Sequence, residues 1–268
     1  MIQIHINKWI KMNILFIGDI VGRAGRRAVR IFLDKIIEEN NVDLVIANGE
    51  NAAGGFGITK KVAEELYGYG IDYLTMGNHT WDNKDIFNFI DDDKRILRPL
   101  NYPDNNPGRG WISAEAAGKK IAVVNLVGQV FMKNNDSPYH KFMELYPEIK
   151  NHDIILVDFH AEATGEKIAF ARAVDGKTAA VIGTHTHVQT NDAQIFPGGT
   201  AYITDAGLTG AVDSVLGMKV EKMVEKMKTS LPVRYEVATG AVSINSVLLK
   251  IDAAANSADK IMVINKNN

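Results

Sequence analysis

Residues 13–19 read NILFIGD, an apolar run that ends in glycine and a carboxylate. A short apolar run without alternation is typical of a strand buried on both faces. Apolar residues at helical spacing follow over 23–39, and a second apolar run, DLVIA, occupies 43–47. Strand, helix and strand in this order predict a parallel α/β unit at the start of the fold.

The same alternation continues outward from this unit. Gly54, Gly55 and Gly57 mark a loop, and Thr59 is placed to cap a helix that ends near Tyr67. The proline- and glycine-rich stretch 99–111 is long for a connection, which favours a functional loop over a linker. We expect an α/β core extended by antiparallel strands. Further strands are predicted at 72–76, 120–126, 153–159, 179–183, 240–251 and 260–265, and further helices at 138–149, 164–173, 214–228 and from Asp82.

The 268 residues fit one α/β domain. We expect residues 12–268 to form it and residues 1–11 to be an N-terminal extension, because a strand follows Met12 at once and Met12 could be the working start. The alternative is an extra strand from Ile2 to Ile6.

Composition excludes several classes of site. There is no cysteine, so a disulfide framework, a zinc–thiolate site and a thiol nucleophile are ruled out, and a reducing, cytoplasmic location fits. No apolar run reaches the ~18 residues of a membrane helix, so no membrane partner is expected. The net charge of -2 gives no general attraction to nucleic acid, although a local basic patch is compatible with it.

Polar side chains follow five of the predicted strands, at the point where each strand ends. In open α/β sheets ligands bind beyond the carboxyl ends of the strands, so these groups are candidates to converge on one site. They are Asp19, Glu50 with Asn51, Asn78 with His79, His160, and His185 with His187.

Each of these residues also has a structural interpretation. Asp19 could cap the following helix, and Glu50 with Asn51 could be turn residues. His185 and His187 are different, because two imidazoles two residues apart on extended backbone point to the same side. That pattern favours metal binding over packing, and it strengthens the interpretation of His160 as a metal ligand.

The candidate ligands are imidazole, carboxylate and carboxamide groups, which suit manganese, iron or zinc ions. Seven or more such groups are too many for one tetrahedral ion. They suit two ions about 3.5–4 Å apart that share a bridging carboxylate and act on a phosphoryl group.

At this point the chain resembles a known family, the calcineurin-like metallophosphoesterases, and within it the YmdB-like bacterial phosphodiesterases. The resemblance covers nearly the whole chain from Met12. It rests on the stretches NILFIGDIVGRAGR, ANGENAAGGFGIT, TMGNHTWD, DFHAEATGEK, GTHTHVQT and PGGTAYITDAGLTG. Two departures from the wider superfamily are shared with this branch. Val21 stands where a histidine is usual, and Glu50 replaces the usual bridging aspartate, with Asn51 able to supply the lost ligand.

The resemblance implies a four-layer fold, in which two packed mixed sheets lie between helices, and a centre of iron or manganese, with zinc also compatible. Glu50 would bridge the two ions and His79 would donate a proton to the leaving oxygen. The substrate would be a phosphodiester, a 2′,3′-cyclic nucleotide, attacked by hydroxide that the two metals activate. One ion would be held by Asp19, Asn51 and His187, and the other by Asn78, His160 and His185.

Two other functions stay open at this point. One is a phosphomonoesterase on the same two-metal site, and the other is a metal-loaded regulatory or RNA-interacting protein with incidental hydrolysis. Arg23, Arg26 and Arg27 begin a helix and could bind phosphate, although a solvated helix face is the more ordinary explanation. RNA is not indicated by the charge, and a homo-oligomer is expected.

Overall fold

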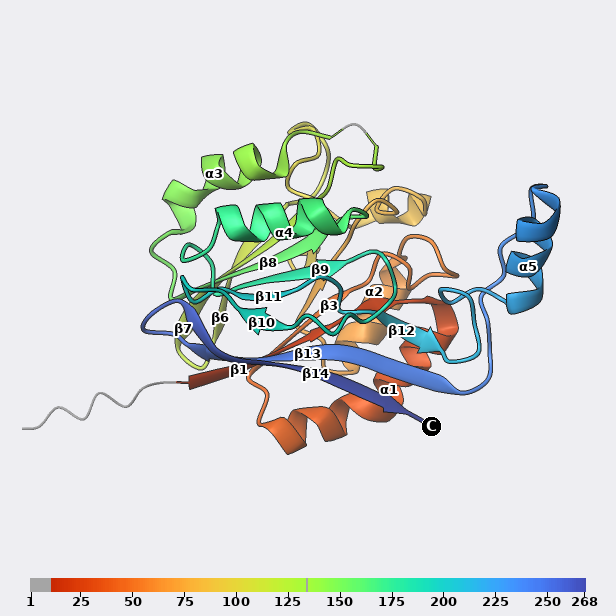
Figure 1. The fold of residues 1–268 in the computed structure, drawn as a ribbon, viewed down its shortest axis with the longest axis horizontal. Helices are drawn as coiled ribbons and strands as arrows, with labels where there is room; N and C mark the ends of the chain where they lie inside the picture. Colours follow the sequence, from red (N-terminus) through yellow and green to blue (C-terminus); the bar gives the residue numbers. More distant parts are fainter. Residues whose placement is uncertain (1–10, 134) are drawn as a thin grey trace, which may run out of the picture.

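The protein is described by a computed structural model that covers residues 11–133 and 135–268. Two mixed β-sheets pack face to face and helices cover both outer faces, which confirms the predicted four-layer fold (Figure 1). Lys11, assigned to the predicted extension, is the first residue of a strand and pairs with Asp252. The alternative strand at Ile2–Ile6 lies outside the described residues.

The larger sheet has eight strands in the order β2-β12-β13-β1-β3-β4-β5, with β14 paired to β13. Parallel strands β1, β3 and β4 form its centre, and the antiparallel hairpin of β13 and β14 extends it, as predicted. The strands are β1 (Lys11–Ile17), β2 (Asp19–Ile20), β3 (Leu44–Asn48), β4 (Tyr73–Thr75), β5 (Ile96–Leu97), β12 (Leu208–Ala211), β13 (Val242–Asp252) and β14 (Ser257–Asn267).

The second sheet has six strands in the order β10-β11-β9-β8-β7-β6. The hairpin of β6 and β7 turns through Ala117 and Gly118, both with positive φ, as a two-residue type I′ turn requires. The strands are β6 (Trp111–Ala116), β7 (Lys119–Val127), β8 (Ile154–His160), β9 (Ala180–Thr184), β10 (Gln194–Ile195) and β11 (Ala201–Ile203).

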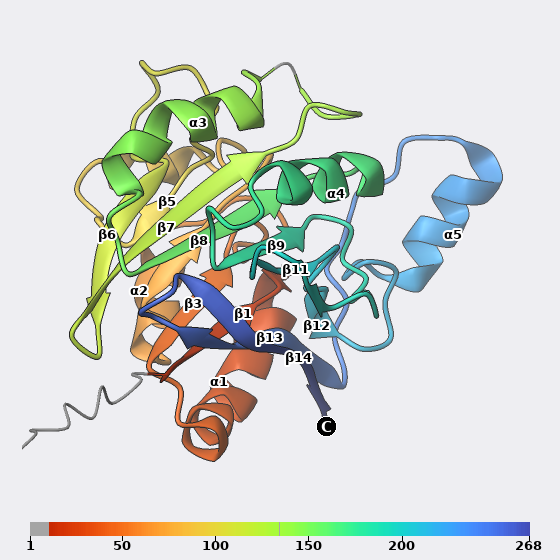
Figure 2. The ribbon, with the colours of Figure 1, turned by 60° about the vertical axis from the view of Figure 1, so that its left-hand side comes forward.

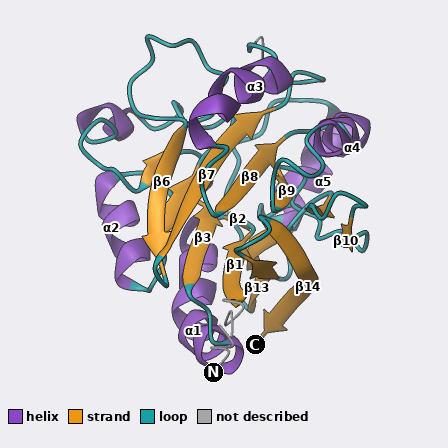
Figure 3. Ribbon diagram, turned by 90° about the vertical axis from the view of Figure 1, so that its left-hand side faces the viewer, coloured by secondary structure: helices purple, strands orange, loops and turns teal. Residues whose placement is uncertain are grey.

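Helices α1 and α2 cover the larger sheet, and α3 and α4 cover the second sheet (Figures 2 and 3). Thr59 caps α2 as predicted, because its side chain accepts a hydrogen bond from the Val62 amide at 3.3 Å. In the described residues no helix is long and apolar enough to cross a membrane. The helices are α1 (Gly22–Asn40), α2 (Lys60–Gly68), the 3₁₀ helix η1 (Lys84–Asn88), α3 (Pro138–Ile149), α4 (Thr164–Ala173) and α5 (Val220–Thr229).

Three apolar clusters hold these layers together. One lies between α1, α2 and the larger sheet, one between the two sheets, and one between the second sheet and α3 and α4. Alternation along β1 shows the division: Ile14 and Phe16 face the other sheet, whereas Leu15 and Ile17 face the helices. The parallel strands of both sheets end at one edge of the molecule, where residues that follow them contact one another.

Two predicted helices begin later than expected. Asp82 does not start a helix; the 3₁₀ turn begins at Lys84, and Asn83 caps it by accepting from the Asp85 amide. The helix predicted from 214 starts at Val220, because Val215 and Met218 instead pair in a short bridge. The stretch 99–111 is irregular up to Trp111, where β6 begins.

Candidate metal centre

All of the strand-end groups lie at the edge where the two sheets end together. Asp19 is in β2, Glu50 and Asn51 follow β3, and Asn78 follows β4, so the larger sheet supplies one half of the group. His160 ends β8, and His185 and His187 follow β9 in the second sheet. The two sheets thus face each other across the site, and residues distant in sequence meet there.

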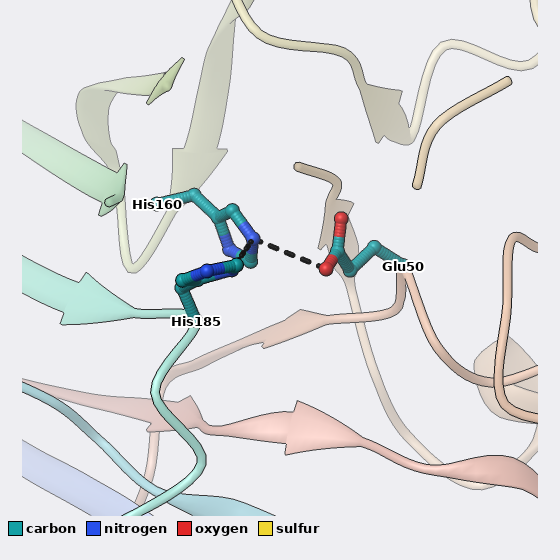
Figure 4. Close-up of side chains that lie close together, drawn as sticks. All are labelled: Glu50, His160 and His185. Carbon is teal, nitrogen blue, oxygen red and sulfur yellow. Dashed lines mark hydrogen bonds and ion pairs between the residues drawn. The ribbon is translucent and has the colours of Figure 1, made fainter. Parts of the chain in front are cut away.

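His160 is the centre of this group and is fully buried. Its Nε2 atom lies 2.9 Å from Asn78 Oδ1, 3.0 Å from His185 Nδ1 and 3.1 Å from Glu50 Oε1. Ligand atoms of Glu50, His160 and His185 all lie within 4.8 Å of one another (Figure 4). One imidazole nitrogen cannot satisfy three such neighbours at once, whereas a shared cation can.

The second half of the group consists of Asp19, Asn51 and His187. His187 Nε2 lies 3.3 Å from Asn51 Nδ2 and 3.8 Å from Asp19 Oδ1. Asp19 Oδ1 is buried and has no hydrogen-bond partner in the described residues. Burying a carboxylate oxygen without a partner costs more free energy than the ~1–3 kcal/mol for a neutral group. The Oδ1 atom of Asp19 is therefore suited to bind a cation.

Glu50 lies between the two halves. Its Oε1 atom accepts from Asn51 Nδ2 at 3.2 Å and its Oε2 atom from the His79 amide at 2.8 Å. Burial alone would raise the pKa of Glu50, but His160 and His79 outweigh it and lower that pKa to about 2. Glu50 is therefore ionised at neutral pH, as a bridging ligand must be.

The two neighbouring imidazoles differ in charge. Burial and the charge of His160 lower the pKa of His185 to about 3, so its ring is neutral. Burial also disfavours the charged form of His160, but Glu50, Asp19 and Asp158 outweigh this and raise the pKa of His160 to about 9. A cation beside Glu50 would take the place of the His160 proton.

Polar neighbours fix the orientation of each imidazole. His160 Nδ1 lies 2.9 Å from Thr184 Oγ1, whose hydroxyl donates to Asp158. His185 Nε2 lies 3.0 Å from Glu162. His187 Nδ1 lies 3.2 Å from the Leu216 carbonyl oxygen, so the other ring nitrogen, Nε2, points toward Asn51. Such outer contacts are characteristic of metal-binding histidines.

The prediction that His185 and His187 lie on extended backbone is wrong. β9 ends at Thr184, and both histidines have positive φ, 102° and 64°. Their rings reach different halves of the site because the chain turns sharply, and not because they share one face of a strand. The alternative that Asp19 caps α1 is also wrong, because Val21 occupies that position and no side chain caps the helix.

Lys167 and Asp205 hold this turn, and the sequence does not reveal the role of Lys167. The lysine is fully buried in α4 and donates to the Thr184 carbonyl at 2.7 Å and to Asp205 at 3.0 Å. Asp205 also accepts from the Thr186 amide at 2.9 Å. A lysine on a helix is ordinarily exposed, so no sequence pattern indicates this contact.

His79 lies at the edge of the group of candidate ligands. Its Nδ1 atom lies 2.6 Å from Asp82 Oδ2, its ring packs edge-on against Phe56, and its side chain is about a quarter exposed. An imidazole that is fixed by a carboxylate at the rim of a site can exchange protons with a bound molecule.

The donor atoms fit a metal centre. They are nitrogen and oxygen only, they come from both sheets, and they include one orphaned carboxylate oxygen and one crowded imidazole nitrogen. Gly77 shows how tightly the group is packed, because a Cβ atom there would overlap the His160 ring and lie 2.5 Å from Glu50 Oε2.

Curated proteins are similar to this chain along nearly its whole length. The chain is 48% identical over 251 residues to the 2′,3′-cyclic-nucleotide 2′-phosphodiesterase of Bacillus subtilis, and the match covers 93% of this chain and 95% of that protein.

Solved structures share the whole fold. A protein from Thermus thermophilus superposes with a TM-score of 0.91 at 38% identity and covers 96% of this chain and 99% of its own. A Mycoplasma pneumoniae protein described as a novel phosphatase superposes with a TM-score of 0.91 at 34% identity, over 96% and 94%. A 5′-nucleotidase precursor from Thermus thermophilus, at 13% identity and a TM-score of 0.57, shares the fold alone; the match covers 95% of this chain and 54% of that one.

The sequence profile of the YmdB-like proteins matches residues 15–264, nearly the whole described chain. Together with these relatives, the match shows that the chain belongs to the YmdB-like family of metallophosphoesterases.

Proposed function

We propose that this protein hydrolyses 2′,3′-cyclic nucleotides at the 2′ ester. The observation that carries the proposal is the cluster around His160 Nε2, together with the unpaired, buried Oδ1 atom of Asp19. The name of the Bacillus subtilis relative, at 48% identity, supports the substrate class.

In this proposal the site holds two ions, one at each of the two groups of contacting side chains described above. Asp19, Asn51 and His187 would hold one ion, and Glu50 would be shared between it and the second. Asn78, His160 and His185 hold the second ion, in agreement with the short contacts that they make with one another. Iron or manganese is the proposed metal, with zinc also compatible with nitrogen and oxygen donors.

Bound ions would supply positive charge that acidifies a water and neutralises the phosphoryl oxygens. His79 has the remaining task. Hydrolysis adds the oxygen of water to phosphorus and breaks the bond from phosphorus to O2′, and O2′ must gain a proton to leave as a hydroxyl. Because Asp82 holds His79 Nδ1, the Nε2 atom is left to deliver that proton. The product is a nucleoside 3′-phosphate.

His79→Ala tests the role of the proton donor. We expect the variant to keep its metal content and lose at least about 100-fold in kcat on 2′,3′-cyclic AMP, the usual contribution of a general acid. His140→Ala is the matched control, because His140 is exposed and outside the site. Unchanged turnover in His79→Ala would remove His79 from the mechanism.

A second candidate is hydrolysis of phosphomonoesters at the same centre, which the Mycoplasma pneumoniae relative described as a phosphatase favours. Rates on a bis-aryl phosphate, an aryl phosphate and 2′,3′-cyclic AMP separate the two. The proposed phosphodiesterase hydrolyses the cyclic nucleotide and the bis-aryl ester much faster than the aryl phosphate; the reverse order supports the monoesterase. A homo-oligomer and a cytoplasmic location remain predictions.

A further inference from the structure

A basic pocket with a volume of about 740 Å³ lies between α1 and α2, and none of the candidate metal ligands lines it. Its cationic side chains include four of the chain's nine arginines, although the chain as a whole has a net charge of -2. Pockets of this size accommodate small molecules or short polymer segments. The cationic groups are Arg23, Arg26, Arg27, Arg30 and Lys61, and one carboxylate, Glu65, lies among them.

Two of the arginines are anchored by the protein itself. Arg26 donates to Glu65 at 3.0 Å and to the Ala52 carbonyl at 2.6 Å, and Arg27 donates to the Gly240 carbonyl. Fixed guanidinium groups lose little further entropy when an anion binds, which is the property of a prepared anion site.

The other three cations have no carboxylate within ion-pair distance in the described residues. They are Arg23, Arg30 and Lys61, and all three are exposed. Arg27 contacts only a carbonyl, so its charge has no carboxylate partner in the described residues either. Four uncompensated charges in one pocket repel one another, so an anion with more than one charge would relieve this repulsion. The pocket thus suits successive phosphates better than a single carboxylate.

The pocket is close to the metal centre. The Ala52 carbonyl that Arg26 contacts belongs to the residue after Asn51, whose amide lies 3.3 Å from His187. Because consecutive Cα atoms are about 3.8 Å apart, the path from the Arg26 guanidinium to the Asn51 amide is at most about 12 Å. A chain of nucleotides that occupied both sites would span this distance within a few residues.

A pair of aromatic rings lies next to His79, and one of them belongs to the segment that leads to the basic pocket. Phe56 packs edge-on against His79 at 5.1 Å between centroids and against Tyr235 at 5.9 Å, and Tyr235 is 40% exposed. The segment from Tyr235 leads to Thr239 and Gly240, which line the basic pocket. Aromatic rings beside a cationic groove are the combination by which proteins bind single-stranded nucleic acid.

We propose that the preferred substrate is an oligoribonucleotide whose 3′ end carries a 2′,3′-cyclic phosphate. Its upstream phosphates occupy the basic pocket, and its terminal base stacks on Phe56 and Tyr235. A free cyclic nucleotide has one phosphate, which the metal centre uses, and so leaves the pocket empty. The inference rests on the proposed function: water adds to the terminal phosphorus, the bond to O2′ breaks, and the oligonucleotide keeps a 3′-phosphate and regains its 2′-hydroxyl.

The test compares kcat/KM of the metal-loaded enzyme on 2′,3′-cyclic AMP and on a pentanucleotide that ends in a 2′,3′-cyclic phosphate. We expect at least about a tenfold preference for the pentanucleotide at low salt. Each phosphate contact on a single strand contributes about 0.7 to the slope of log affinity against log salt. With up to three contacts, the pentanucleotide should show a slope steeper by about 2 than the mononucleotide.

The variant Arg23→Gln/Arg30→Gln/Lys61→Gln removes the three exposed charges that the protein does not anchor and leaves Arg26 and Arg27 in place. We expect it to lose most of the preference and most of the extra salt slope. Anisotropy of a labelled pentanucleotide with a 3′-phosphate, measured on metal-free protein, should show the same loss of binding. The matched control Lys35→Gln/Lys94→Gln/Lys150→Gln removes the same charge from exposed positions outside the pocket and should keep the preference.

The outcomes separate the two proposals. Hydrolysis of 2′,3′-cyclic AMP with no preference for the pentanucleotide, or equal losses in the pocket and control variants, overturns this inference and leaves the proposed function intact. Such a result would assign the pocket to another anion. Failure to hydrolyse either substrate overturns the proposed function, and this inference with it.

Discussion

At the scale of single residues, the centre depends on short distances around one buried histidine. His160 Nε2 has three polar neighbours within 3.1 Å, and the backbone of Gly77 passes directly beside them. A protein interior packs as densely as an organic crystal, so a single added methyl group has no room there. The absence of a side chain at Gly77 is therefore part of the site.

Gly77→Ala tests this packing. The added Cβ would overlap the His160 ring and approach Glu50, so the side chains must move apart. We expect the variant to lose most of its bound metal and its phosphodiesterase activity, measured by elemental analysis and by turnover of 2′,3′-cyclic AMP. Gly165→Ala is the matched control, because no atom lies within 4 Å of a Cβ there. Equal metal content in both variants would show that the packing at Gly77 is unimportant.

The candidate ligands could be named from the sequence because they stand at the ends of apolar strands. Parallel strands end at one edge, so Asp19, Glu50 and His160 are expected to meet there without any knowledge of distances. Two residues that position the site could not be named in this way. Asp82 reads as the start of a helix and Lys167 as an exposed helical lysine, and only the three-dimensional contacts show their partners.

At the scale of elements, α4 positions the turn that follows β9. Lys167 of α4 reaches the Thr184 carbonyl and Asp205, and Asp205 holds the Thr186 amide between the two histidines. The positive φ angles of His185 and His187 cost free energy, so the turn needs such support. A helix on the outside of the sheet thereby fixes ligands at its edge.

Lys167→Ala should destabilise the protein by about 3–5 kcal/mol, because it leaves the buried carboxylate of Asp205 without its cation. Urea unfolding of metal-free protein measures the change. Lys222→Ala, which removes an exposed partner of Glu225, is the matched control and should cost no more than ~1 kcal/mol. A loss no larger than that of the control would mean that the buried pair does not support the turn.

Long elements were predictable from the sequence, and most short ones, β4 excepted, were not. The long strands and α1 to α4 follow from apolar runs and helical spacing, and they appear close to where the sequence places them. β2, β5, β10, β11 and β12 have two to four residues, too few to show a period. β6 is longer, but its half-exposed residues do not alternate cleanly, and the I′ turn at Ala117 lacks the usual asparagine.

At the scale of the whole molecule, one sheet built from both ends of the chain and one built from its middle together form the candidate centre. The larger sheet supplies the carboxylate and amide oxygens, and the second sheet supplies the imidazoles. Charge is distributed unevenly as well. A net charge of -2 hides a pocket with five cations, so whole-chain charge is a poor guide to partners when basic residues cluster on one helix face.

Elemental analysis of the purified protein, after equilibration with Mn²⁺ and removal of free metal, tests the central claim most directly. The arrangement of Asp19 with His187 and of His160 with His185 around Glu50 predicts about two ions per chain. Fewer than about one ion per chain, with no gain on adding Mn²⁺, would contradict the two-metal centre and the hydrolysis proposed for it.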